Sequence, residues 1–244
     1  MTTIKASSLA ALLAASSALA QSAPVGSLQG SVTDPQGQPI AGAQVAYRRR
    51  FNAIAIGNGV MPAPGEAQAF GTTVTGADGA YLAPGLPVGP YMLCVNVPSA
   101  PYVDPCAWQQ PFSATVSANQ TTPQTLVLTK GVYLKVRIND PLGLLPQVED
   151  GAWTPRKLIV GVKYAEGAYQ GAENTAVDSA GRDYRLVLPT GQAFWLWLFS
   201  RDVALADSRG AAVDTSGSLI PFQPVAGQDQ VFTFTVSGPA RQAP

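Results

Sequence analysis

Two cysteines, Cys94 and Cys106, are the side chains of this 244-residue chain best suited to covalent chemistry. An exported chain with two cysteines most simply forms one disulfide. The loop between the two residues is short, and a bond across it stabilises a fold by about 3 kcal/mol. We therefore predict a Cys94–Cys106 disulfide, with a pair of free thiols as the alternative.

The chain has no histidine. Ser-His-Asp and Cys-His nucleophiles and histidine-ligated metal sites are therefore excluded. Several carboxylates are scattered over the second half, and none has calcium-loop spacing: Asp178, Asp183, Asp202, Asp207 and Asp214. We predict no catalytic residue, no metal site and no cofactor, and thus a protein that is not an enzyme.

The stretch "FWLWLF", 194 to 199, is apolar on both alternating faces. If Phe194, Leu196 and Leu198 point into a sandwich core, the other three rings point outward and need a cover. The first half of the chain, a loop or an oligomer partner could cover them. Alternatively the rings form a carbohydrate platform, or the register is reversed and the tryptophans lie in the core.

The loop 98–111, which carries Cys106, also bears Tyr102 and Trp108. These rings either complete the packing of the loop or form the rim of a binding surface. The candidate ligand platform therefore comprises Trp195, Trp197, Phe199, Tyr102 and Trp108.

The first twenty residues, "MTTIKASSLAALLAASSALA", resemble a secretory signal peptide. A single lysine precedes a run of small and apolar residues that ends in an A-x-A site. We predict cleavage after Ala20, a secreted or periplasmic location, a bacterial origin and no transmembrane segment.

Charge is balanced, because fourteen basic and fifteen acidic residues follow Ala20. This balance gives no indication of nucleic-acid binding. The one basic cluster, Arg48-Arg49-Arg50, reads as the end of a strand that enters a loop. A patch for phosphate or an anionic glycan is the alternative.

Short runs of Val, Thr, Leu and Tyr, broken by Gly, Pro, Asp and Asn, predict an all-β fold. Two stretches, 51–70 and 98–111, read as long loops. In the first half we expect about seven strands, at 28–33, 43–47, 72–75, 81–82, 91–97, 112–116 and 125–129.

The second half repeats the skeleton of the first. Asp34-Pro35-x-Gly37 matches Asp140-Pro141-x-Gly143, and three pairs share an offset of 102: Gly79/Gly181, Pro87/Pro189 and Gly89/Gly191. Ordered matches at a near-constant spacing indicate two copies of one unit, in which the repeated turn closes the first hairpin. We predict a signal peptide at 1–20, sandwiches at 21–130 and 131–238, and a disordered tail at 239–244.

The motifs "GSVTDPQGQPIAGAQVAY" and "TGADGAYLAPGLPVGPYMLCV" resemble the carboxypeptidase regulatory-like domain family. The resemblance covers roughly residues 26–130, and the second unit keeps only its skeleton. It implies Greek-key sandwiches of the transthyretin or prealbumin type, related to Cna-type B repeats and to starch-binding-domain-like folds. Such domains are usually non-catalytic stalks, interaction modules or carbohydrate binders.

We therefore expect an exported structural or interaction module that serves adhesion or scaffolding at the cell envelope. The alternative is a carbohydrate-binding module whose platform centres on Trp195 and Trp197. The corresponding partners are other envelope proteins or glycans.

Overall fold

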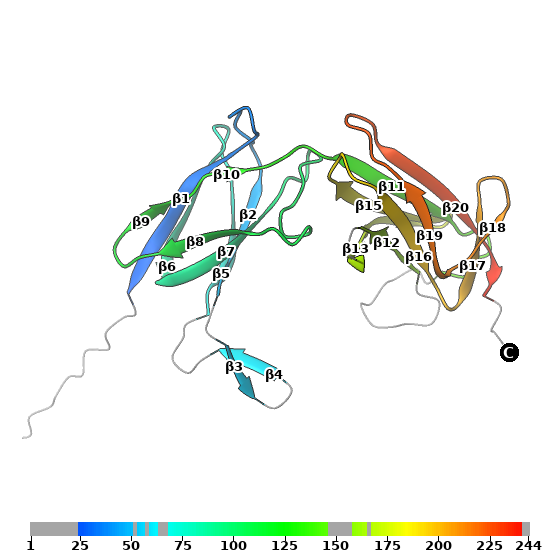
Figure 1. Cartoon of the computed structure of the whole chain (residues 1–244), viewed down its shortest axis with the longest axis horizontal. Helices are drawn as coiled ribbons and strands as arrows, with labels where there is room; N and C mark the ends of the chain where they lie inside the picture. Colours follow the sequence, from blue (N-terminus) through cyan, green and yellow to red (C-terminus); the bar gives the residue numbers. More distant parts are fainter. Residues whose placement is uncertain are drawn as a thin grey trace, which may run out of the picture.

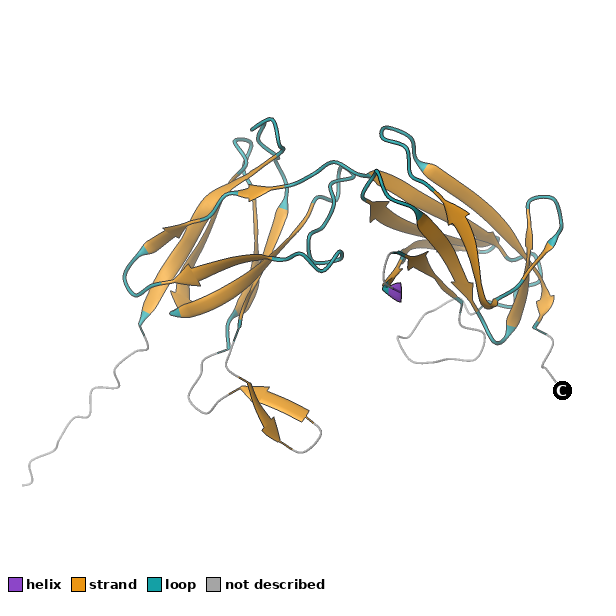
Figure 2. Ribbon diagram, in the orientation of Figure 1, coloured by secondary structure: helices purple, strands orange, loops and turns teal. Residues whose placement is uncertain are grey.

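The computed structural model describes residues 24–50, 53–56, 59–62, 68–145, 158–164 and 167–240. These residues form β-strands joined by turns and loops and contain no α-helix (Figures 1 and 2). The predicted all-β fold class is confirmed. The predicted signal peptide and its cleavage site at Ala20 lie outside the described residues.

The first half of the chain folds into two sheets that pack face to face (Figure 1). One sheet has the order β10-β1-β6, and β9 also pairs with β1; its strands are β1 (Val25–Thr33), β6 (Ala80–Pro87), β9 (Thr121–Pro123) and β10 (Leu126–Val127). The other has the order β5-β2-β7-β8; its strands are β2 (Gln44–Arg49), β5 (Phe70–Val74), β7 (Gly89–Asn96) and β8 (Phe112–Val116).

Alternation of side chains along these strands makes the first core. On β7, Tyr91, Leu93 and Val95 are buried between the sheets, whereas Met92 and Cys94 point to the outer face. Side chains two positions apart lie on the same face of a strand, so one register buries the whole apolar set. Leu28 and Leu126 close the core from the opposite sheet.

The second half also forms a pair of packed sheets. One has the order β14-β15-β11-β20-β17-β18; its strands are β11 (Val132–Asn139), β14 (Glu173–Asp178), β15 (Gly181–Leu188), β17 (Val203–Asp207), β18 (Ala212–Val213) and β20 (Gln230–Pro239). The other has the order β13-β12-β16-β19; its strands are β12 (Ile159–Lys163), β13 (Tyr169–Gly171), β16 (Phe194–Phe199) and β19 (Ser216–Phe222). We refer to the two pairs of sheets as the first and the second sandwich.

Strand pairing corresponds between the two sandwiches. β1 lies between antiparallel β6 and parallel β10, and β11 lies between antiparallel β15 and parallel β20. In the other sheets, β2 lies between β5 and β7, and β12 between β13 and β16. The sequence matches between the two halves therefore lie at or next to strands that hold equivalent positions in the two sandwiches.

The repeated Asp-Pro-x-Gly turn does not join paired strands, and the prediction that it closes the first hairpin is wrong. After a single bridge between Thr33 and Pro39 the chain crosses from β1 to β2 in the opposite sheet. The Asp34 carboxylate accepts the backbone N–H groups of Gln36 and Gln38 at 2.9 and 2.8 Å. These hydrogen bonds stabilise a turn that leads from one sheet to the other, not a turn that joins two paired strands.

Asp140 plays the corresponding part in the second sandwich, and it is buried there. Its two carboxylate oxygens accept the N–H groups of Leu144 and Leu145 at 3.0 and 2.7 Å. A buried carboxylate needs such donors to offset its lost hydration, so this turn is more firmly fixed than its counterpart at Asp34.

The stretch 51–70 is not only a loop, contrary to the prediction. It contains β3 (Ala53–Ile56) and β4 (Gly59–Pro62), which pair with each other as an antiparallel ribbon. The high content of alanine, glycine and proline weakens the strand signal of this stretch, so the sequence does not predict the ribbon.

Steric crowding explains why glycine stands directly before β6 and at the first position of β15. Gly79 has φ +73°, and an added Cβ would lie 2.6 Å from the carbonyl oxygen of Val32. At Gly181 a Cβ would collide with the carbonyl oxygen of Ile138. In both sandwiches, therefore, the first strand passes so close to this position that no side chain fits.

We predict that Gly79→Ala lowers the free energy of unfolding by about 2–4 kcal/mol, because it adds a backbone collision to an unfavourable positive φ. Gly37→Ala is the matched control, since Gly37 has φ +78° and open space around it. It should cost only about 1 kcal/mol. Urea unfolding of both variants measures the difference, and equal losses would contradict the steric explanation.

Candidate functional site

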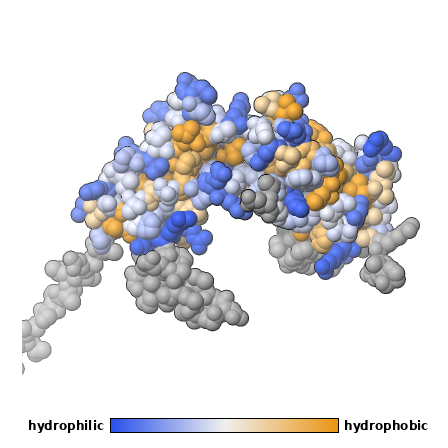
Figure 3. All heavy atoms as spheres, in the orientation of Figure 1, coloured by the Kyte–Doolittle hydropathy of each residue, from blue (hydrophilic) through white to orange (hydrophobic). Residues whose placement is uncertain are grey.

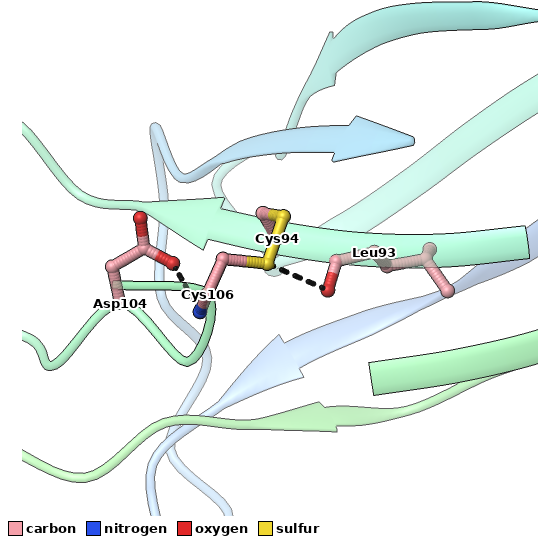
Figure 4. The surroundings of a disulfide bond; sticks show 4 residues. All are labelled: Leu93, Cys94, Asp104 and Cys106. Atoms are coloured by element: carbon pink, nitrogen blue, oxygen red, sulfur yellow. Dashed lines mark hydrogen bonds between the residues drawn. A yellow bond between two sulfur atoms is a disulfide. The ribbon is translucent and has the colours of Figure 1, made fainter. Parts of the chain in front are cut away.

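Cys94 and Cys106 form the predicted disulfide (Figure 4). Cys94 points outward from the middle of β7, and Cys106 lies in the loop 97–111 that follows this strand. The two Cα atoms are 5.4 Å apart, within the usual range for a disulfide. The bond holds the loop against the outer face of its own sheet, where the Cys106 sulfur lies 3.7 Å from the carbonyl oxygen of Leu93.

Asp104 shapes the same loop (Figure 4). Its carboxylate accepts the backbone N–H of Cys106 at 2.9 Å. Burial raises the pKa of this carboxyl, and hydrogen bonds from backbone N–H groups, including those of Cys106 and Ala107, partly oppose that effect. Its position is explained by the turn that it stabilises, so the raised pKa does not identify a catalytic acid.

Trp108, near the end of the loop, packs into the second sandwich. Its side chain is only 9% exposed and belongs to the core cluster that contains Val132, Leu188 and Phe194. The indole meets Tyr164 edge-on at 5.0 Å and Phe194 at 5.5 Å between ring centroids. Trp108 is thus an anchor between the sandwiches and does not display its ring to a ligand.

Two polar atoms are buried at this anchor without a hydrogen-bond partner among the described residues, the indole Nε1 of Trp108 and the hydroxyl of Tyr164. An unpaired buried donor costs about 1–3 kcal/mol. The packing of the rings must therefore outweigh that cost.

Tyr102 and its neighbours connect the loop to the chain between the sandwiches. Tyr102 forms an isolated bridge with Lys130, the amide of Val103 donates to Thr129 at 2.9 Å, and the amide of Gly131 donates to Pro101 at 2.6 Å. A Cβ on Gly131 would collide with the carbonyl oxygen of Leu188. The chain around Gly131, where the first sandwich passes into the second, is therefore tightly packed against both sandwiches.

A cleft of about 380 Å³ lies where the loop meets β14 and β15. Its wall combines rings and charges, namely Tyr102, Asp104, Trp108, Tyr133, Glu173 and Arg185. The guanidinium of Arg185 lies 5.3 Å from the ring centroid of Tyr133, a cation–π contact. Tyr102 belongs to this cleft, and the structure does not bring it together with the tryptophans of β16.

The tryptophans of β16 have the register that the sequence predicts. Phe194, Leu196 and Leu198 are buried, and Trp195, Trp197 and Phe199 lie half-buried on the outer face. The reversed register, with the tryptophans in the core, is therefore wrong.

Trp197 is the centre of an aromatic group on this outer face. Tyr169, which is 49% exposed, lies 4.8 Å from Trp197, and Phe199 stacks beside it at 6.1 Å between centroids. The strand register places Gly161, which has no side chain, next to Trp197. Tyr169 was not predicted for this group, because only the pairing of β13 with β12 brings it there. In the view of Figure 3 apolar and polar residues are mixed on the surface of both sandwiches.

The carboxylates of the second half make surface ion pairs and turns. Arg137 bonds Asp178 at 3.0 Å and Asp183 at 3.2 Å, and its hydrogen bond lowers the pKa of Asp178. Asp207 accepts backbone N–H groups of its own turn, which lowers its pKa as well. Among the described residues no His, Cys, Asp and Glu side chains gather into a metal-binding group. Nor does that part of the chain contain a helix with the length and apolarity needed to span a membrane.

Comparison with known families gives one match. Residues 27–129 match the model of the "Carboxypeptidase regulatory-like domain", which includes every strand of the first sandwich except the first two residues of β1. None of the curated proteins compared with the chain matches it.

Solved structures with a similar course of the chain share little sequence with it. The Streptococcal ancillary pilin is 15% identical, with a TM-score of 0.39, over 87% of this chain and 62% of that one. The Bacillus anthracis TIE protein is 15% identical (TM-score 0.32; 87% and 34%), and the full-length major pilin SpaD from Corynebacterium diphtheriae is 12% identical (0.33; 82% and 64%). This chain spans less than two thirds of each, and scores of this size assign no function.

The family match covers the turn at Asp34, the strands around the first core, and the loop that holds Cys106 and Trp108. It also agrees with the motifs from which the resemblance was predicted. The first sandwich of this chain belongs to the carboxypeptidase regulatory-like domain family.

Proposed function

We propose that this chain is an exported, non-catalytic module of two firmly coupled sandwiches that serves adhesion or scaffolding at the cell envelope. Residues 1–20 act as a signal peptide cleaved after Ala20, and 21–130 and 131–238 act as the two domains. The predicted disordered tail at 239–244 does not begin at 239, because Pro239 belongs to β20 and pairs with Val203. The partners of this module are other envelope proteins.

The anchor at Trp108 is the observation that carries this proposal. A ring from the first sandwich contributes to the core of the second, and a disulfide on β7 fixes the loop that delivers it. Domains joined only by a linker normally move relative to one another unless their interface is large and apolar. An apolar anchor with a covalent tie instead favours a stiff spacer, which is the property that a stalk or scaffold needs.

The chemistry of the side chains agrees with a non-catalytic role. The chain has no histidine, and the perturbed carboxyl pKa values belong to turns and ion pairs. The disulfide supports export, because such bonds persist in oxidising compartments.

Trp108→Ala tests the anchor. We expect a loss of about 3–5 kcal/mol in the unfolding free energy of the second sandwich, because a buried ring is replaced by a cavity. Trp108→Phe is the matched control; it keeps an aromatic ring and removes the unpaired indole N–H, and it should cost less than Trp108→Ala because it leaves a smaller cavity. Urea unfolding gives these energies.

The same variant should loosen the coupling of the sandwiches. Backbone NMR relaxation of the mature chain should give one tumbling time for the native protein and for Trp108→Phe, and two shorter times for Trp108→Ala. Independent tumbling of the native sandwiches would refute the stiff spacer.

The disulfide is tested by replacing Cys94 and Cys106 with serine together. The crosslink restricts the unfolded chain, so its loss should cost about 3 kcal/mol. Because the bond also positions Trp108, we expect the double variant to show the shorter tumbling times of Trp108→Ala. If stability falls and coupling is unchanged, the disulfide only stabilises its own sandwich.

A second candidate function is carbohydrate binding by the aromatic group on the outer face of β16. The exposed ring of Tyr169 beside Trp197 favours it, since sugar rings pack on aromatic faces. Trp195 and Phe199 extend the same face along the strand.

Trp197→Ala tests this candidate. On titration with a panel of neutral oligosaccharides, a shift in tryptophan fluorescence is expected for the native chain, and Trp197→Ala should weaken binding about tenfold, the loss of one stacking contact. Phe70→Ala is the control, because Phe70 is an exposed ring on the first sandwich. Absence of any shift across the panel would exclude this function.

A further inference from the structure

We propose that the open edge of β5, next to Arg48 and Arg50, is a docking site for an extended acidic peptide that joins the first sandwich as an additional strand. The inference rests on the proposed role as an interaction module and deepens it by naming the chemical class of the partner.

The edge itself is the first observation. In the sheet β5-β2-β7-β8, β5 has β2 as its one partner in the described part of the chain. On the β2 side, the amide of Thr75 donates to the carbonyl of Ala43, and the carbonyl of Ala69 accepts the amide of Arg49. In an antiparallel pair successive residues alternate between the two sides. The backbone N–H and C=O groups of Phe70, Thr72 and Val74 therefore point away from β2 to the open edge.

The composition of β5 leaves this edge unprotected. Its sequence, Phe-Gly-Thr-Thr-Val, has no charge and no proline, the usual devices that prevent pairing with another chain. Phe70 is 78% exposed and Val74 is 58% exposed.

Other edges of the first sandwich are better protected. At the opposite edge of the same sheet, the hydroxyl of Thr122 in β9 donates to the carbonyl of Thr115 in β8 at 3.0 Å. In the other sheet, β6 contains Pro84 and Pro87. β5 is thus more open to an added strand than β8 or β6.

Charge and shape beside this edge indicate what the strand must carry. Register places Phe70, Arg48 and Met92 side by side on the outer face. Adjoining hollows of about 310 and 350 Å³ surround this row and reach Arg50. Arg48 and Arg50 are exposed and have no acidic partner among the described residues.

Arg49 differs from its neighbours. Its guanidinium donates to the carbonyl of Val88 through Nε at 3.1 Å and Nη2 at 2.9 Å, so it helps to fix the turn before β7. The run of three arginines therefore divides into one structural residue and two that face solvent.

These features fit an extended peptide with acidic side chains on one face. A strand added at β5 would lie about 10 Å from β2, a distance that a glutamate and an arginine side chain span together. The backbone hydrogen bonds supply affinity, and the side chains beside them supply selectivity, as in other strand additions. Because side chains alternate between the faces of a strand, the acidic side chains would lie beside Phe70 and Arg48, and the apolar side chains would lie on the opposite face of the sheet.

The experiment uses the mature chain and a fluorescent peptide of five alternating Val-Glu pairs, and measures binding by anisotropy. Thr72→Pro removes one outward N–H without touching the bonds to β2, a position where proline is tolerated. Thr72→Val keeps that N–H. We expect at least tenfold weaker binding for Thr72→Pro and for Arg48→Glu with Arg50→Glu, and native binding for Thr72→Val and for Arg209→Glu, a charge control on the second sandwich.

A second readout leaves the protein unchanged, in case Thr72→Pro fails to fold. Peptides methylated at alternate backbone nitrogens are compared in the two possible phases. Strand addition requires that one phase binds at least tenfold more weakly than the other.

The proposal is overturned if both phases bind equally, if a Val-Lys peptide binds as well as Val-Glu, or if no peptide binds at concentrations up to about 1 mM. If a heparin fragment binds and none of the peptides does, the arginines form an anionic-glycan site instead, and this result also overturns the proposal. None of these results alters the tumbling times that test the stiff spacer, so the two proposals fail separately.

Discussion

The arrangement of this molecule depends on one ring, the indole of Trp108, which the first half of the sequence supplies and the core of the second sandwich buries. A buried tryptophan contributes more apolar contact than any other side chain, so one such residue can tie two sandwiches together. It does so only if the loop before it is fixed, which the Cys94–Cys106 bond and the Asp104 turn accomplish. Stability of the second core and orientation of the first sandwich are therefore two consequences of the same contact.

The two sandwiches have similar residues on the inner face of β7 and β16 and different residues on the outer face. Tyr91, Leu93 and Val95 on β7 correspond to Phe194, Leu196 and Leu198 on β16, and all six are buried. Packing constrains these positions, because a core tolerates only side chains of similar volume. The outward positions between them are under no such constraint, and there Cys94 stands where the second sandwich has Trp197. One sandwich thus uses this position to hold a loop, and the other uses it for a half-buried aromatic ring.

The features that the sequence predicts correctly are those that local chemistry determines. Alternation in "FWLWLF" gave the correct register, because one inward set must be apolar throughout, and the two cysteines gave the disulfide. Prediction from the sequence failed where the answer depends on distant segments. The turn at Asp34 was recognised as a bend, but turn residues do not specify which sheet receives the next strand. Likewise nothing near Trp108 indicates Tyr164 and Phe194, more than fifty positions away, as its neighbours, and Tyr169 joined the aromatic group only through strand pairing.

The loop at Cys106 also decides which surfaces of the first sandwich stay open. It is tied over the outer face at Cys94, beyond the middle of β7, and it leaves that face toward the second sandwich. Among the described residues, no loop covers the part of this outer face at Arg48 and Met92. No strand or loop of the described chain covers the edge at β5 either. An unpaired edge is a liability that most proteins suppress. Here β5 itself carries no charge, and the nearest exposed arginines are Arg48 on β2 and Arg50 directly after it. Two exposed arginines beside an open edge repel basic strands and attract acidic ones, so they favour an acidic partner.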